Sequence, residues 1–188
     1  MQKSTILNSI FITLSILVLS SCSHSRKMSG VAKNKDIKSH IRIRNAVTSV
    51  NINPGKTTPE EFIEFAESLK GIKYSFGGSK KETGFDCSGF VWYVFNHFNI
   101  KAPRISVEYT NAGHEIPIVE SKKGDIILFT GSDSKSRTVG HMGLVTDNQN
   151  DKITFIHSAS GGGRGIMESQ MTQYFTDRFV KVNRFFKP

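Results

Sequence analysis

Three side chains in this sequence have the types and spacing expected of a thiol-based catalyst, namely Cys87, His141 and His157. Cys87 follows Asp86, which favours the N-cap of a helix, and precedes an apolar stretch over residues 90–98. A cysteine in the first turn of a helix lies beside backbone N–H groups that stabilise a thiolate and the oxyanion formed when it attacks a carbonyl. The pattern therefore indicates a nucleophilic cysteine, and its alternative is a small buried hydrophobic residue.

The two histidines lie on predicted strands on either side of a polar turn. Strands are predicted over residues 139–146 and 153–158. In a hairpin centred on Gln149, His141 and His157 would stand directly opposite each other, with Cβ atoms about 5 Å apart. One imidazole would then be the general base for the thiol, and the other would orient it. A register slip of one residue would send the two histidines to opposite faces.

Two other interpretations of these three residues stay open. They could bind zinc, but they lack the close C-x-x-C or H-x-x-x-H pairs of common zinc sites, so we expect no metal and no other cofactor. Each histidine taken alone is also compatible with a structural position in a sheet. The remaining histidines are assigned no role: His24, His40, His97 and His114.

The elements that must position these residues predict an α+β fold, with N-terminal helices packed on an antiparallel β-sheet. Thr58 as N-cap, Pro59 and Glu61 predict a helix that ends before Gly71. The cysteine helix has an apolar stripe of Phe90, Val91, Val94, Phe95 and Phe98. Strands are predicted at 126–129, 139–146, 153–158 and 180–185. Helices followed by strands are typical of this fold class.

The N-terminal third of the chain predicts export. Residues 1–21 carry one charge, Lys3, and an apolar run too short for a comfortable membrane span, as in a signal peptide. The four residues that end at Cys22 resemble a bacterial lipobox, which implies cleavage before Cys22 and lipidation of its thiol. An ordinary cleaved signal peptide and an uncleaved anchor are the alternatives. Residues 22–56 then form a basic polar tether, and residues 57–188 form a single domain.

The chain is basic, with 25 Lys and Arg against 16 Asp and Glu and a formal net charge of +9. This balance suits an anionic partner such as a cell-wall polymer or a membrane surface, although it is equally compatible with a role in solubility. No nucleic-acid-binding motif is present, so we expect no nucleic-acid partner. We expect a monomer at the cell envelope, anchored to a membrane through its N-terminal lipid.

Several motifs in one order give the region from about residue 57 onward a family resemblance. They are Tyr74 with Gly77-Gly78, Asp86-Cys87-Ser88-Gly89-Phe90, Pro103-Arg104-Ile105-Ser106, Gly124-Asp125 with the strand after it, Gly140-His141-Met142-Gly143, and Ile156-His157-Ser158. Together they resemble the NlpC family of papain-like cell-wall endopeptidases. The resemblance implies a papain-like fold in which Cys87 attacks, His141 is the base and His157 orients it.

The same resemblance implies that Tyr74 lines the site and helps to hold the substrate or the oxyanion. Ser88 and Arg104, from two of the motifs, are further candidates for substrate or oxyanion contacts. The chain departs from the family pattern at three positions near the motifs: Phe76, where tryptophan is common, Tyr109, near which a glutamine is common, and Lys123, where proline is common. These departures concern the substrate groove and leave the catalytic set unchanged.

The function implied by the resemblance is hydrolysis of peptidoglycan stem peptides, commonly at the bond from γ-D-glutamate to the diamino acid. A thioester with Cys87 would be the intermediate. Two alternatives stay open from the sequence. The first is a non-hydrolytic wall-binding protein on the same fold, for which a helix-capped thiol is unnecessary. The second is an amidase or acyltransferase that shares the thioester.

Overall fold

The computed structural model describes residues 51–150, 152–161 and 164–187. The predicted signal peptide, Cys22 and most of the predicted tether lie outside these residues. All described residues belong to one compact unit. Ile52 is buried in the main core of that unit, so the packed domain begins before residue 57.

The first helix forms where its capping residues predict it. Helix α2 (Pro59–Glu67) has Thr58 as N-cap, and Thr58 and Glu61 form the reciprocal bonds of a capping box. Helix α3 (Cys87–His97) has Asp86 as N-cap, and the Asp86 side chain accepts a hydrogen bond from the Gly89 N–H at 2.6 Å. Four residues of the predicted apolar stripe are buried, and the fifth, Phe98, is half-buried against the same core. The sequence signals thus correctly locate both helix starts.

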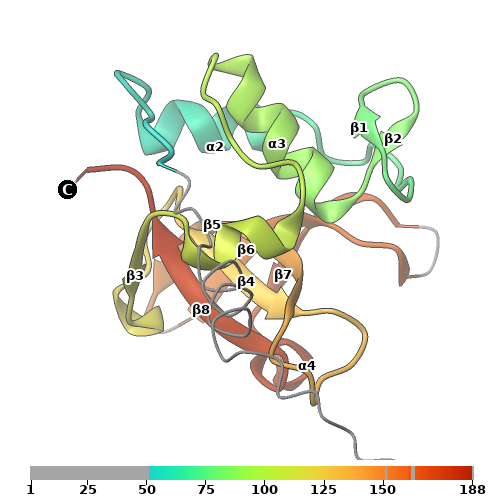
Figure 1. The fold of residues 1–188 in the computed structure, drawn as a ribbon, viewed down its shortest axis with the longest axis vertical. Helices are drawn as coiled ribbons and strands as arrows, with labels where there is room; N and C mark the ends of the chain where they lie inside the picture. Colours follow the sequence, from blue (N-terminus) through green and yellow to red (C-terminus); the bar gives the residue numbers. More distant parts are fainter. Residues whose placement is uncertain (1–50, 151, 162–163, 188) are drawn as a thin grey trace, which may run out of the picture. The chain divides into compact units, whose positions relative to one another are not determined.

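Six strands form one sheet in which all neighbours are antiparallel. The strands are β3 (His114–Ile116), β4 (Ile126–Thr130), β5 (Val139–Gln149), β6 (Lys152–Ser158), β7 (Ile166–Gln170) and β8 (Phe179–Arg184), in the order β3-β8-β4-β5-β6-β7. Figure 1 shows α2 and α3 on the same side of this sheet. The predicted α+β class is therefore confirmed.

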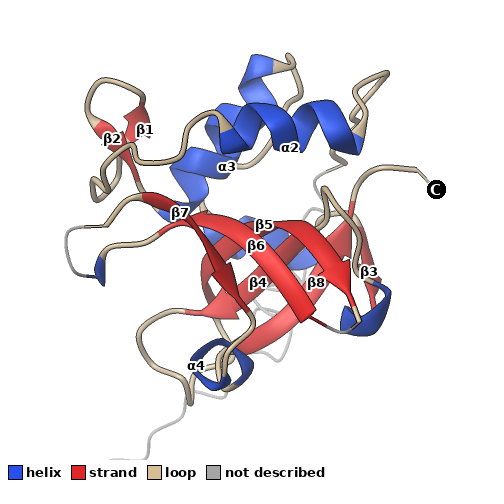
Figure 2. Cartoon of the chain, turned by 180° about the vertical axis from the view of Figure 1, so that it is seen from behind, coloured by secondary structure: helices blue, strands red, loops and turns tan. Residues whose placement is uncertain are grey.

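Alternation along the strands divides the apolar side chains between two cores. Ile126 and Leu128 of β4 join the core between the sheet and α2 and α3. Ile127 and Phe129, on the other face of the same strand, join a second core with Phe155. The short helix α4 (Gln173–Thr176) lies near the second core, at the opposite side of the sheet from α2 and α3 (Figure 2).

The sequence patterns missed the short and peripheral elements. These are the hairpin of β1 (Ser79–Lys80) and β2 (Gly84–Phe85), strands β3 and β7, helix α4, and two 3₁₀ helices at Ser106–Asn111 and Ile118–Glu120. Strand β7 contains few apolar residues because it is the edge of the sheet, so its hydrophobic pattern is weak. Over the described ranges, no helix has the length and apolar content needed to cross a membrane.

The hairpin that carries the two histidines differs from the predicted one in register. Leu144 stands opposite Ile156, and one step further along the strands Gly143 comes beside His157. A Cβ on Gly143 would lie 3.2 Å from the His157 Cβ. His141 is therefore a diagonal neighbour of His157, and the predicted direct opposition is wrong by two residues. Because side chains alternate with a period of two, both still lie on one face.

A β-bulge at Thr146 keeps the two histidines on that common face. At the turn, Gln149 pairs with Lys152. If this register continued without interruption, residue 144 would stand opposite His157. His141 would then point to the other face of the sheet. The register shifts by one residue around Thr146, which stands in the bulge, and the shift restores the required parity. The turn alone therefore does not bring the histidines together.

Candidate active site

Cys87 is held between the first turn of α3 and the backbone of β5. Its side chain is half-buried, and its Sγ atom lies 3.9 Å from the carbonyl oxygen of Gly140. Gly89 permits a close approach of the helix to the preceding loop, because a Cβ at this position would collide with the carbonyl oxygen of Gly78. The sequence thus brings the thiol against the strand that carries His141.

Burial makes the resting thiol a weaker acid than its helical position alone predicts. Burial and the nearby Asp86 carboxylate raise the pKa of Cys87 to about 11. The backbone N–H groups of Cys87 and Ser88 at the helix N-terminus lower that pKa, as does the N–H of Met142 on β5, but they are the smaller influence. The resting cysteine is therefore a neutral thiol that needs a base when it attacks.

The two imidazoles are in direct contact. His141 Nε2 and His157 Nδ1 are 2.8 Å apart, and His157 Nε2 is 2.9 Å from Ser169 Oγ on β7. In one arrangement of protons, His141 donates from Nε2 to His157 Nδ1, and His157 donates from Nε2 to the Ser169 hydroxyl. The Nδ1 atom of His141 is then free to accept the thiol proton. One chain of tautomers thus gives His141 the form that a general base requires.

The environment of this pair keeps both rings uncharged. Burial lowers the pKa of His141 to about 4. Burial, together with the proximity of His141 and Arg164, lowers the pKa of His157 to about 3. The ring centre of His157 lies 5.1 Å from that of Phe155 and 5.6 Å from that of Phe175. These aromatic neighbours exclude water, which disfavours the imidazolium form.

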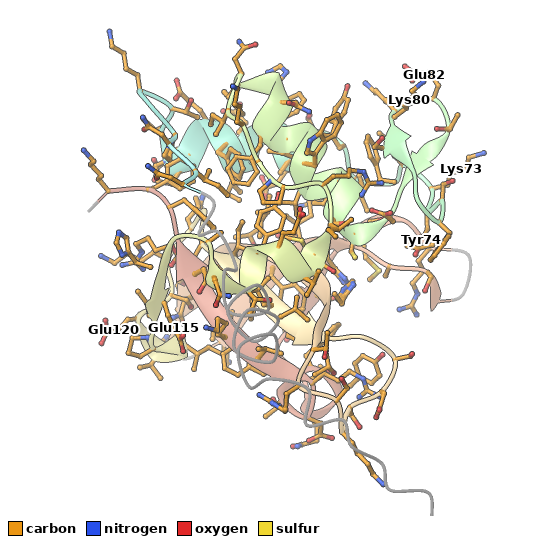
Figure 3. All side chains as sticks on the ribbon, viewed as in Figure 1. Lys73, Tyr74, Lys80, Glu82, Glu115 and Glu120 are labelled. Carbon is orange, nitrogen blue, oxygen red and sulfur yellow. The ribbon has the colours of Figure 1, made fainter. Side chains whose placement is uncertain are left out.

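Cys87, His141 and His157 line one pocket of about 550 Å³. Its wall also includes Tyr74 from the loop before the β1–β2 hairpin and residues 130–132 at the end of β4. Four residues around α4 complete it: Thr172, Tyr174, Phe175 and Arg178. In Figure 3, Tyr74 lies at the base of the β1–β2 hairpin, whose outer part carries Lys80 and Glu82. The structure therefore brings together all three residues that the sequence singled out as a catalytic set.

Tyr74 stands in this pocket with its hydroxyl protonated at neutral pH. Burial, with smaller contributions from Cys87 and Asp86, raises the pKa of the Tyr74 phenol. Its backbone N–H donates to the carbonyl oxygen of Arg164 at 3.0 Å, which ties the Tyr74 loop to the opposite rim. Tyr74 and Cys87 line the same pocket, and the role of Tyr74 in holding the substrate or the oxyanion stays a prediction.

Ser88 and Arg104 have contacts that favour a positioning role over direct substrate contact. The Arg104 guanidinium donates to both carboxylate oxygens of Asp86, each at 3.1 Å, and to the carbonyl oxygens of Gly77 and Gly78 at 2.8 and 3.1 Å. It also donates to the Ser88 hydroxyl at 3.2 Å. Neither residue is among those that line the pocket. Arg104 therefore fastens the loop before β1 to the cap of the cysteine helix.

We expect Arg104→Met to destabilise the protein by about 2–4 kcal/mol, because it leaves the Asp86 carboxylate without its charged partner and the Gly77 carbonyl oxygen without a donor. Urea unfolding measures the change. Arg137→Met is the matched control, since Arg137 is exposed and makes a single bond to the Phe179 carbonyl oxygen. Equal stability of the two variants would contradict the positioning role.

The pocket also includes polar residues to which the sequence analysis assigned no role, among them Arg164, Ser169 and Arg178. Ser169 lies on the unpredicted edge strand β7, and Arg178 follows the unpredicted helix α4, so no sequence signal placed either near the cysteine. Among the residues that the structure describes, no three His, Cys, Asp or Glu side chains are grouped as metal ligands.

Comparison with known sequences finds several cell-wall hydrolases that are similar to this chain. The model of the NlpC/P60 family matches residues 71–184. A gamma-DL-glutamyl hydrolase of Bacillus subtilis is 27% identical over 73% of this chain and 32% of its own length. Murein DD-endopeptidase MepH of Escherichia coli is 29% identical over 83% of this chain and 58% of its own length. This chain therefore spans about a third to somewhat over half of these relatives.

Solved structures share the fold. An NlpC/P60 family protein of Bacillus cereus has a TM-score of 0.61 at 23% identity, over 70% of this chain and 41% of that chain. A Staphylococcus aureus protein described as similar to lipoprotein, of the same family, has a TM-score of 0.59 at 25% identity, over 77% of this chain and 45% of that chain. The first of these likenesses concerns the fold alone.

Proposed function

Because the chain belongs to the NlpC/P60 family, we propose that it is a cysteine endopeptidase that hydrolyses peptidoglycan stem peptides at the bond from γ-D-glutamate to the diamino acid. The observation that carries this proposal is the 2.8 Å contact between His141 Nε2 and His157 Nδ1 in the pocket that contains Cys87. A relative in Bacillus subtilis is named gamma-D-glutamyl-L-lysine dipeptidyl-peptidase and is 31% identical over 96 residues, which supports this choice of bond.

In the proposed acylation, His141 Nδ1 takes the proton of the Cys87 thiol as Sγ attacks the peptide carbonyl. The Cys87 backbone N–H and the Tyr74 hydroxyl donate to the oxyanion. As the tetrahedral intermediate collapses, the C–N bond breaks, the leaving amine takes the proton from His141, and a thioester remains. His141 then deprotonates a water molecule that attacks the thioester, which releases the carboxylic acid and returns the proton to Sγ.

Because Cys87 and His141 are both uncharged at rest, the base must be well oriented toward the thiol. With a thiol pKa of about 11 and an imidazole pKa of about 4, little thiolate exists before the substrate arrives. Proton transfer must therefore accompany the attack, and a fixed His141 tautomer contributes directly to the rate. The contact of His141 with His157 at 2.8 Å, and that of His157 with Ser169 at 2.9 Å, support such a fixed tautomer.

The experiment that tests the function is mass spectrometry of muropeptides after incubation with the purified protein, beside its Cys87→Ala variant. We expect new fragments with the first protein only, with masses that correspond to cleavage after γ-D-glutamate. Fragments cut at another bond would refute the proposed specificity. Binding to cell wall without cleavage by either protein would favour a wall-binding module instead.

We expect kcat/KM to stay level as the pH falls from neutral through 6.5, and to drop only near the lowered pKa of His141, about 4. The physical reason is that the buried imidazole stays an unprotonated base at a pH where a solvated one would be protonated. Initial rates on a soluble stem peptide across this range measure the profile. An acid limb centred on the ordinary histidine value of 6.5 would contradict the burial of this base.

A stability measurement across the same range separates protonation from unfolding. In the unfolded chain both imidazoles titrate near 6.5, whereas in the folded protein they titrate near 4 and 3. Their contribution to stability is therefore complete above pH 6.5 and is lost as the pH falls through the folded values, because the unfolded chain binds protons first. Thermal unfolding at each pH identifies rates that fall only because the protein unfolds.

We further propose that lipidation of Cys22 anchors the protein to a membrane of the bacterial cell envelope. The short apolar segment and the four residues ending at Cys22 support this, as does the lipoprotein-like description of the Staphylococcus aureus relative. Metabolic labelling with a fatty acid in wild-type and Cys22→Ser cells tests it. Equal label in both proteins would refute lipidation at this cysteine.

A further inference from the structure

Building on the proposed function, we propose that Arg178 and Arg164 form a binding site for a carboxylate of the stem peptide inside the active-site pocket. Both residues line the pocket that contains Cys87, and they are the two permanently charged residues of its wall. Among the described residues, the wall includes no Asp or Glu. A pocket with this charge balance selects an anionic group on the bound molecule.

Arg178 is held in place by Tyr174 but is not neutralised. Its Nη1 donates to the Tyr174 carbonyl oxygen at 3.1 Å, and its Cζ lies 3.9 Å from the centre of the Tyr174 ring. Its Nε is buried without a hydrogen-bond partner. Stacking and one backbone bond fix the plane of the guanidinium while the charge stays uncompensated. A preorganised guanidinium of this kind suits the planar geometry of a carboxylate.

Arg164 supplies a second positive charge from another element of the pocket. It precedes β7 and is exposed, and its backbone carbonyl oxygen accepts from the Tyr74 N–H. Its charge reaches the catalytic pair, because it contributes to lowering the pKa of His157. In the described parts of the chain, neither Arg164 nor Arg178 has a carboxylate within 4.0 Å, unlike Arg104 and Arg184.

The proposed reaction leaves both arginines without a role, since proton transfer and oxyanion binding use Cys87, His141, His157 and Tyr74. A γ-linked glutamate keeps a free α-carboxylate near the scissile bond. The diamino acid adds another carboxylate when it ends the peptide or has one in its side chain. A charge-assisted contact to one of these groups would fix the peptide in the pocket. We therefore assign the arginine pair to substrate selection by charge.

The test uses two synthetic stem peptides of the same sequence. In one, all side-chain carboxylates and α-carboxylates are free, and in the other they are all converted to amides. We expect wild-type protein to prefer the free acid. Arg178→Gln should lower kcat/KM for the acid by about 10- to 100-fold, mainly through KM, because a charge-assisted hydrogen bond is lost. The amidated peptide should change by less than about 3-fold, since it never had that contact. Arg164→Gln should also lower kcat/KM for the acid more than for the amidated peptide, with a smaller loss than Arg178→Gln.

Lys152→Gln is the matched control for loss of one positive charge. Lys152 is exposed at the turn of the β5–β6 hairpin, at the far end of the strands from the histidines. We expect it to leave both peptides unaffected. If Arg178→Gln lowers kcat/KM equally for the two peptides, the carboxylate site is refuted and Arg178 acts by packing on Tyr174. If it changes kcat/KM for neither peptide, the carboxylate site is refuted as well.

A binding measurement separates this inference from the proposed function. Calorimetric titration of the Cys87→Ala protein with the same two peptides gives their affinities without turnover. A preference for the acid that Arg178→Gln removes supports the site even if the active protein cuts neither peptide, an outcome that refutes only the peptidase. Competition with inorganic phosphate and with acetate distinguishes the two kinds of anion. If phosphate displaces the acid peptide as well as acetate does, or at a lower concentration, the site is a phosphate site and the proposal is overturned.

Discussion

Replacing Cys87 with serine is expected to reduce peptidase activity by about 10⁴-fold or more while the fold stays intact. The hydroxyl of serine is a far weaker acid than a thiol, and the neutral environment of the site cannot compensate, since burial already raises the pKa of the thiol to about 11. As a donor, Sγ makes one weak hydrogen bond, to the Gly140 carbonyl oxygen at 3.9 Å, and serine differs from cysteine by one atom, so the change costs little packing. Muropeptide turnover and thermal unfolding measure the two effects.

The control for this variant is Ser88→Ala, one residue further along α3. Ser88 is buried and its hydroxyl accepts a hydrogen bond from Arg104, but Ser88 does not line the pocket. We expect it to lose some stability and to keep most of its activity. Full activity in Cys87→Ser, or an equal loss in both variants, would falsify the assignment of Cys87 as the nucleophile.

Replacing His141 with alanine is expected to be the second most severe change, with a loss of about 10² to 10⁴-fold in kcat. The thiol would then have no base, and with a pKa of about 11 it would be almost entirely protonated at neutral pH. Binding of the stem peptide should persist, so KM should change far less than kcat. An unchanged kcat in this variant would show that another group takes the thiol proton.

His157 offers a graded comparison, because its expected role is to orient His141. We expect the loss of kcat in His157→Ala to be smaller than that in His141→Ala by about one to two orders of magnitude. His157→Asn should recover part of this loss, since an amide oxygen can take the place of Nδ1, which lies 2.8 Å from His141 Nε2. A merely structural role for His157 would make the two substitutions equivalent, in both the rate and its pH profile.

Local signals in the sequence were sufficient for the parts of the fold that depend on neighbouring residues. Thr58 and Asp86 cap their helices as predicted because capping depends on residues within one turn. The four predicted strands form because their apolar residues are buried against two cores. The same reasoning fails for β7 and α4, which are short and peripheral and owe their structure to the elements they contact.

The sequence by itself determined which residues could form a thiol site, namely Cys87 at a capped helix start and two histidines on adjacent strands. Only the tertiary structure decided that the histidines meet, because their common face depends on a bulge at Thr146 that no residue pattern signalled. It also decided the protonation states of the site, since burial by residues distant in sequence outweighs the local effect of the helix N-terminus. Capping is a local property of the chain, whereas strand register and desolvation are set by long-range packing.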